Sequence, residues 1–183
     1  MDAITGENNQ NLVAEETVYT EKLEEYTQEE RQDIFLAPFY SYFLASASDG
    51  GIIAAAREFA EFDRVMVDSL EQLKGNKLVE ASFWNLDSEA KRKDAHQKIK
   101  TEGQNFEAVK QEFFPLIKRA VEITKTKACK KDAGEYLYFI YDIADRVVNA
   151  SGEGFLGTGE KVSPKEKEFL EEFRNLLGLG SSD

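Results

Sequence analysis

Apolar residues recur at three- and four-residue steps in each patterned segment of the chain, which is the spacing of one face of an α-helix. Segment 134–151 shows this clearly, because Leu137, Ile140, Ala144 and Val148 fall on one such face. No segment shows the two-residue alternation of a half-buried strand. The sequence therefore predicts an all-α protein, folded as a single-domain bundle of about six helices.

Capping residues and glycine stops set the expected helix boundaries. Thr27 and Glu30 have the spacing of a capping box. Ser163 and Glu166 repeat that spacing, and Pro164 between them suits the first position of a helix. The second half of the third helix is nearly all polar and should bury little surface. The expected helices cover about residues 27–48, 52–74, 79–100, 106–125, 134–151 and 163–177.

The rest of the chain divides around this helical domain. Residues 1–26 are polar and acidic and are expected to form a mobile N-terminal arm. Residues 27–178 form the helical domain, and residues 179–183 form a flexible C-terminal tail. Pro38 and Pro115 lie inside expected helices, where each removes one backbone donor and should produce a kink.

Charge and composition exclude several classes of partner. The chain carries 35 acidic and 23 basic side chains, a formal charge of −12, which repels phosphate backbones and argues against nucleic acid. No apolar run approaches the roughly 20 residues of a membrane span, and the first residues do not read as a signal peptide. We therefore expect no membrane insertion and a cytoplasmic location. The densest basic run, KTKACKK, lies where a helix should end. Its positive charges are expected to interact favourably with the negative pole of that helix.

A glycine-rich stretch has the spacing of a dinucleotide-binding loop. Gly152, Gly154 and Gly157 match the GxGxxG signature. That signature requires a buried strand leading into the glycines, with a helix opening from them to bind the pyrophosphate. The segment before these glycines has helical spacing instead. We interpret the stretch as an interhelical connection and expect no nucleotide cofactor.

Residues typical of catalysis are few. His96 is the lone histidine and lies in a polar stretch, whereas general base chemistry needs a sheltered site and an orienting partner. Lys93 stands where the Glu-x-x-His pair of a di-iron bundle needs its glutamate, which excludes that class. Cys129 is the lone cysteine, and only lysines near it suggest activation. We therefore expect that the protein is not an enzyme.

Aromatic residues at helical spacing are expected mostly in the core, Trp84 among them. Tyr136, Tyr138 and Tyr141 are the exception. Some of these three must lie off the face that carries Leu137, where they can present contact area to a protein partner. The sequence indicates neither the identity of that partner nor the oligomeric state.

Two interhelical loops resemble each other. The first helix ends in ASASDGGI and the fifth in NASGEGFLGTGEKVSPKE, so each has small residues, a glycine turn, an aliphatic residue and an acidic helix start. This suggests a duplicated helix-loop-helix unit. The pattern is similar to that of the tellurite-resistance TerB-like helical proteins: Ala-x-x-Asp-Gly, an aliphatic residue, then a glutamate in the next helix. The resemblance spans about residues 27–177.

The resemblance implies two related helical halves and a divalent metal bound by acidic residues around the loops. It also implies a link to stress and metal-resistance systems, without catalysis. A cation such as calcium takes about six to eight oxygens, so the two loops would have to approach each other. The sequence departs from the pattern at Ala54–Ala56 and at Thr158, where carboxylates are expected. The candidate metal ligands are Asp49, Glu58, Asp145, Glu160 and Glu166.

The same carboxylates also have simpler roles. Glu160 and Glu166 sit at a helix start, where negative charge interacts favourably with the helix pole. Asp49 before Gly50 is an ordinary turn pair. These roles need no metal.

Three functions remain open on the sequence. The first is a stress-linked interaction or sensing module that binds a divalent metal at its acidic loops. The second is a metal-independent helical adaptor that binds a protein through Tyr136, Tyr138 and Tyr141. The third is an enzyme with a carboxylate-lined pocket, which a carboxylate of strongly raised pKa would favour.

Overall fold

A computed structural model of the chain describes residues 23–48, 55–86, 106–151 and 162–180. Within these ranges the protein is all-α, with six helices and no strand, as the sequence predicts. The helices are α2 (Gln28–Ser48), α3 (Ala55–Gln72), α4 (Lys77–Leu86), α6 (Phe106–Lys127), α7 (Lys130–Ser151) and α8 (Pro164–Leu177).

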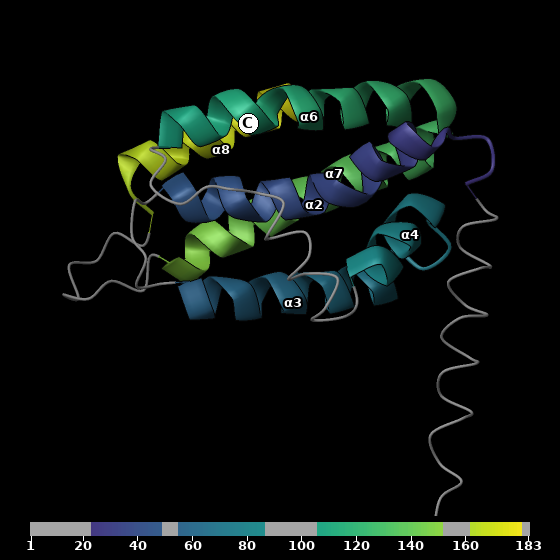
Figure 1. Cartoon of the computed structure of the whole chain (residues 1–183). Coiled ribbons are helices and arrows are strands. Elements are labelled where there is room, and N and C mark those ends of the chain that lie inside the picture. The colour runs from purple at the N-terminus through teal and green to yellow at the C-terminus, as the bar shows by residue number, and fades with distance from the viewer. Residues whose placement is uncertain (1–22, 49–54, 87–105, 152–161, 181–183) are drawn as a thin grey trace, which may run out of the picture.

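The helices form three layers, with α2 and α7 in the middle (Figure 1). Helices α6 and α8 cover one side of this pair, and α3 and α4 cover the other. A helix packed on both sides has to be apolar nearly all round. Accordingly, every residue of α2 from Ala37 to Ala45 is buried. The buried residues of α7 are Ala133, Tyr136, Leu137, Phe139, Ile140, Ile143, Ala144, Val147 and Val148.

A hydrogen bond between the two middle helices replaces one that Pro38 removes. Pro38 lies within α2 and has no N–H, so the carbonyl of Ile34, four residues earlier, loses its usual donor. The hydroxyl of Tyr136, in α7, donates to that carbonyl, and both residues are fully buried. Burial raises the pKa of Tyr136 far above its usual value, although a hydrogen bond with Ser82 opposes the rise. The phenol is therefore a neutral donor.

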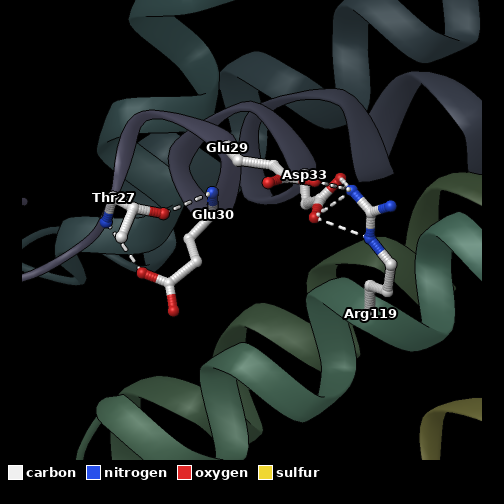
Figure 2. Close-up of polar contacts among 5 residues, drawn as sticks. All are labelled: Thr27, Glu29, Glu30, Asp33 and Arg119. Atoms are coloured by element: carbon white, nitrogen blue, oxygen red, sulfur yellow. Dashed lines mark hydrogen bonds and ion pairs between the residues drawn. The ribbon is translucent and has the colours of Figure 1, made fainter.

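Both predicted capping boxes are confirmed. At the start of α2, the Glu30 N–H donates to Thr27 Oγ1 over 3.2 Å, and the Thr27 N–H donates to Glu30 Oε2 over 2.7 Å (Figure 2). At the start of α8, Ser163 and Glu166 exchange the equivalent bonds at 3.3 and 2.6 Å. Pro164 is the first residue of α8, as predicted.

Packing begins before Thr27. Leu23 and Tyr26 are buried, and the Tyr26 N–H closes a turn on the Leu23 carbonyl at 2.9 Å. The ammonium group of Lys127, at the end of α6, lies 5.4 Å from the centre of the Tyr26 ring. Leu23 and Tyr26 thus pack although they fall within residues 1–26, which were expected to form a mobile arm. Residues 1–22 lie outside the described part of the chain.

The basic run KTKACKK spans two helices. Lys125 and Lys127 lie in the last turn of α6, as expected. Lys130 and Lys131 instead begin α7, at a positive pole, so the interpretation as a C-terminal cap is wrong for this half. Lys125 donates to the carbonyl of Leu177 over 3.1 Å and thereby caps the last turn of α8 rather than its own helix.

An ion pair holds α6 against the start of α2. The Asp33 carboxylate in α2 accepts from Arg119 Nε at 2.9 Å and from Arg119 Nη2 at 2.7 Å (Figure 2). The Asp33 side chain is 9% exposed, whereas that of Arg119 is 47% exposed. Next to this pair, a 2.6 Å bond from Lys127 lowers the pKa of Glu30. The start of α2 is thus attached to α6 at two points.

Replacing Arg119 with methionine keeps the aliphatic stem but leaves the Asp33 carboxylate in place without its guanidinium. We expect Arg119→Met to lower the free energy of unfolding by about 1–3 kcal/mol, the usual cost of a buried polar group left unpaired. Arg119 is half-exposed, so water can reach the Asp33 carboxylate once the arginine is replaced. The loss of stability should therefore stay below that for a fully buried ion pair. Urea denaturation measures the change. The control Lys118→Met, on the exposed side of α6, should stay within about 0.5 kcal/mol of the parent; equal losses in both variants would contradict this account.

Candidate functional site: the outer face of α7

One stripe of α7 lies outside the core or at its edge. It consists of Tyr138, Tyr141, Asp142, Asp145 and Arg146, which recur at helical steps and are exposed or partly buried. We call this stripe the outer face of α7. Because the other sides of α7 are packed in the middle of the bundle, these side chains project from a rigidly held helix.

The tyrosines of α7 are divided between the core and this face. Tyr136 is fully buried, which makes it unable to contact a partner as the adaptor hypothesis expected. Tyr138 is 57% exposed, and Tyr141 is partly buried. The ring centroids of Tyr138 and Tyr141 are 6.5 Å apart. The prediction that some of the three lie off the Leu137 face is confirmed for Tyr138, whereas Tyr141 is partly buried against the edge of the core.

Helix α8 borders the outer face with an arginine. Arg174 Cζ lies 5.2 Å from the centroid of the Tyr141 ring, within the range of a cation–π contact. The Nε of Arg174 also donates to the carbonyl of Gly180 over 2.6 Å, which restricts the side chain. Tyr141 is therefore covered on one side by a held guanidinium.

Helix α3 borders the outer face on its other side through a network centred on Arg146. Arg146 Nη1 lies 2.7 Å from Asp68 Oδ2 and 3.8 Å from Glu61 Oε1, both in α3. Its Nε lies 3.2 Å from Asp142 Oδ2 within α7. Arg146 thus pairs with a carboxylate of its own helix and also joins α7 to α3.

Asp145 lies on the same face and is partly buried. Burial raises the pKa of its carboxyl, and the neighbouring Asp142 raises it further, while Arg146 and Arg174 lower it. The net rise shows that the two nearby guanidinium groups do not fully offset the loss of water and the charge of Asp142. Burial is the largest of these causes, so the raised pKa reflects the loss of water first and the charge of Asp142 second.

The sequence alone did not identify Arg174, Asp68 and Glu61 as neighbours of these tyrosines and aspartates. Their contacts join segments far apart in the chain, and no local pattern reports which helices pack together. A usable signal was present on α7, where Tyr138 and Asp142 fall on the side opposite Ile140. That spacing marks an exposed stripe but does not name what borders it.

The candidate metal ligands are only partly described. Asp49 and Glu160 lie outside the described residues, as does the side chain of Glu58. Asp145 faces the arginines above, and the Glu166 carboxylate accepts the Ser163 N–H in its capping box. Among the described residues, no group of three or more His, Cys, Asp or Glu side chains is arranged to hold a metal ion. Metal binding at the loops stays a prediction.

Other sequence candidates also fall beyond what is described. His96, the glycines at 152–157 and the side chain of Trp84 lie outside the described residues. The helix that leads into those glycines is described: α7 extends to Ser151 and is helical, as the interpretation against a nucleotide loop requires. Cys129 is exposed, and its sulfur accepts the Asp132 N–H at 3.4 Å in the first turn of α7.

Comparison with known proteins gives no relative: no family model, curated protein or solved structure matches the chain. The resemblance to TerB-like proteins, the duplicated halves and the link to stress therefore stay predictions. In the described part of the chain, each helix is too short or too polar to cross a membrane.

The capping and metal roles of Glu166 predict different outcomes for Glu166→Gln. Glutamine keeps an oxygen for the Ser163 N–H but removes the charge that a hard cation favours. We expect the capping outcome, in which calcium leaves the parent's melting temperature unchanged and the variant shows the same small loss with calcium or with chelator.

A metal role would appear differently. Calcium at a hundredfold excess over its dissociation constant would stabilise the parent by about 2.7 kcal/mol. Both Glu166→Gln and Asp49→Asn would lose that gain, since each removes one charged ligand. This pattern would contradict the capping account and support the metal hypothesis.

Proposed function

We propose that the protein is a non-enzymatic, helical protein-binding module that docks a partner through the outer face of α7. The observation that carries this proposal is Tyr138, which is 57% exposed on a helix that otherwise belongs to the core. Among the described side chains, only Tyr138 and Val67 are large hydrophobic residues with this degree of exposure. The partner is unknown.

The composition of the outer face suits protein recognition. Tyrosine and arginine are enriched in protein interfaces and in the residues that dominate binding energy. A tyrosine supplies a large contact area with few rotatable bonds, so holding it in place costs little conformational entropy. Tyr138, Tyr141 and Arg174 lie together here. Packing of α7 against α2 and α3 keeps the face in position before any partner arrives.

The enzyme alternative is favoured by one observation, the raised pKa of Asp145. A carboxyl group of this kind can act as a general acid when a substrate is held within hydrogen-bond reach. Ion-pair networks that only stabilise a fold also shift pKa values, and Asp145 lies beside one such network. We place this alternative second, and the stress-linked metal-sensing hypothesis stands behind it until a cation is shown to bind.

Photocrosslinking tests the proposed docking face. A photoreactive phenylalanine analogue replaces Tyr138 in the full chain, and in a control chain it replaces Lys118, which is exposed on α6. We expect irradiation of cells that naturally make the protein to give a discrete crosslinked product from position 138 and none of that size from position 118. Because Tyr138 is mostly exposed, its replacement should change stability by no more than about 0.5 kcal/mol.

Two results would contradict the proposal. One is the absence of any product specific to position 138 while the protein is folded and abundant. The other is an identical set of products from both positions, which would indicate collisions rather than docking. Repeating the crosslink in Tyr141→Ala should weaken the product at position 138, because the two rings are neighbours.

A further inference from the structure

The charges around the outer face of α7 are unequal. Asp68 and Asp142 lie 2.7 and 3.2 Å from the guanidinium of Arg146. Glu61 lies 3.8 Å from Arg146 and is held at 2.6 Å by Arg64. Asp145 adds a fourth carboxylate, and Arg174 adds a third guanidinium. Asp68, Asp142 and Arg146 keep side-chain exposures of 39, 25 and 30%, so an approaching partner experiences these charges. Among the described side chains at this face, the carboxylates therefore outnumber the guanidinium groups by four to three.

Tyr141 shows how positive charge can be held at this face. Arg174 lies over the Tyr141 ring at 5.2 Å. Within the described chain, no cation occupies the equivalent position over Tyr138, although its ring is the more exposed of the two. An exposed tyrosine ring beside several carboxylates can bind a guanidinium group, because the ring face and the carboxylates both attract it.

We propose that the partner of the outer face is a basic protein segment, which places an arginine over Tyr138 and within reach of Asp142 and Asp145. This inference rests on the proposed function and specifies the chemistry of the partner. An acidic segment would be repelled by the same carboxylates. The formal charge of −12 favours encounter with basic segments, while Tyr138 fixes where one docks.

A synthetic peptide tests this chemistry directly. The probe is a fluorescent, alanine-based peptide with arginine at every fourth position, titrated into the full chain and followed by anisotropy. We expect saturable binding that weakens with salt. Tyr138→Ala should weaken it by about three- to tenfold, the range expected for an exposed cation–π contact with its packing area. Tyr138→Phe keeps the ring and should bind nearly as well as the parent.

Matched controls separate docking from general attraction to an acidic protein. Asp145→Asn and Glu168→Gln each remove one negative charge. Glu168 lies on the side of α8 that faces Lys110 of α6, away from Tyr138. We expect Asp145→Asn to weaken binding and Glu168→Gln to leave it nearly unchanged. The same peptide with glutamine in place of arginine should not bind.

Defined results would overturn the inference. Equal weakening in Asp145→Asn and Glu168→Gln, with no effect of Tyr138→Ala, would show nonspecific binding to net charge. No binding of the arginine peptide would overturn it as well. If position 138 still gives its specific crosslinked product, the docking function stands and only the basic chemistry of the partner is wrong. If that product is also absent, the proposed function fails too.

Discussion

The contact between Tyr136 and the Ile34 carbonyl is the interaction on which the arrangement of the two middle helices depends. Pro38 removes the N–H that would bond this carbonyl within α2. The carbonyl is buried, so leaving it unpaired would cost about 1–3 kcal/mol. The Tyr136 hydroxyl supplies the donor from α7. A defect within one helix thus becomes a specific link between two, and it fixes which side of α7 turns inward.

The outer face follows from this choice. With Tyr136 directed into α2, residues two and five positions later in the helix, Tyr138 and Tyr141, point away from that contact. Arg146 then meets Asp68 of α3, and Arg174 of α8 meets the Tyr141 ring. The recognition surface that we propose is therefore a consequence of core packing. Pro115 differs from Pro38 because it is exposed on α6, where water can bond the freed carbonyl.

Much of the fold could be predicted from the sequence, because its signals are local. Helical spacing located each helix, and the serine, threonine and glutamate of the two capping boxes located two starts closely. The predictions that were wrong depended on contacts with other segments of the chain. Tyr26 meets Lys127 at the end of α6, and the split of the basic run depends on α7 starting at Lys130.

The candidate site was less predictable for the same reason. Helical spacing showed that some tyrosines leave the core face but did not show which, because α7 is packed on several sides. Tyr136 is buried with its hydroxyl on the carbonyl that Pro38, about one hundred positions earlier, leaves without its helical donor. Likewise, Glu166 of the metal hypothesis lies at the start of α8, where its carboxylate takes part in a capping box.

A double-mutant cycle of Tyr136→Phe and Pro38→Ala tests the central claim most directly. Alanine at position 38 restores the N–H that Ile34 needs, so the carbonyl no longer depends on Tyr136. We predict that Tyr136→Phe lowers the free energy of unfolding by about 1–3 kcal/mol in the parent and by clearly less in Pro38→Ala. Loss of the contact with Ser82 occurs in both backgrounds and cancels in the cycle. An equal loss in both backgrounds would contradict the account, because Tyr136 would then not be replacing the donor that Pro38 removes.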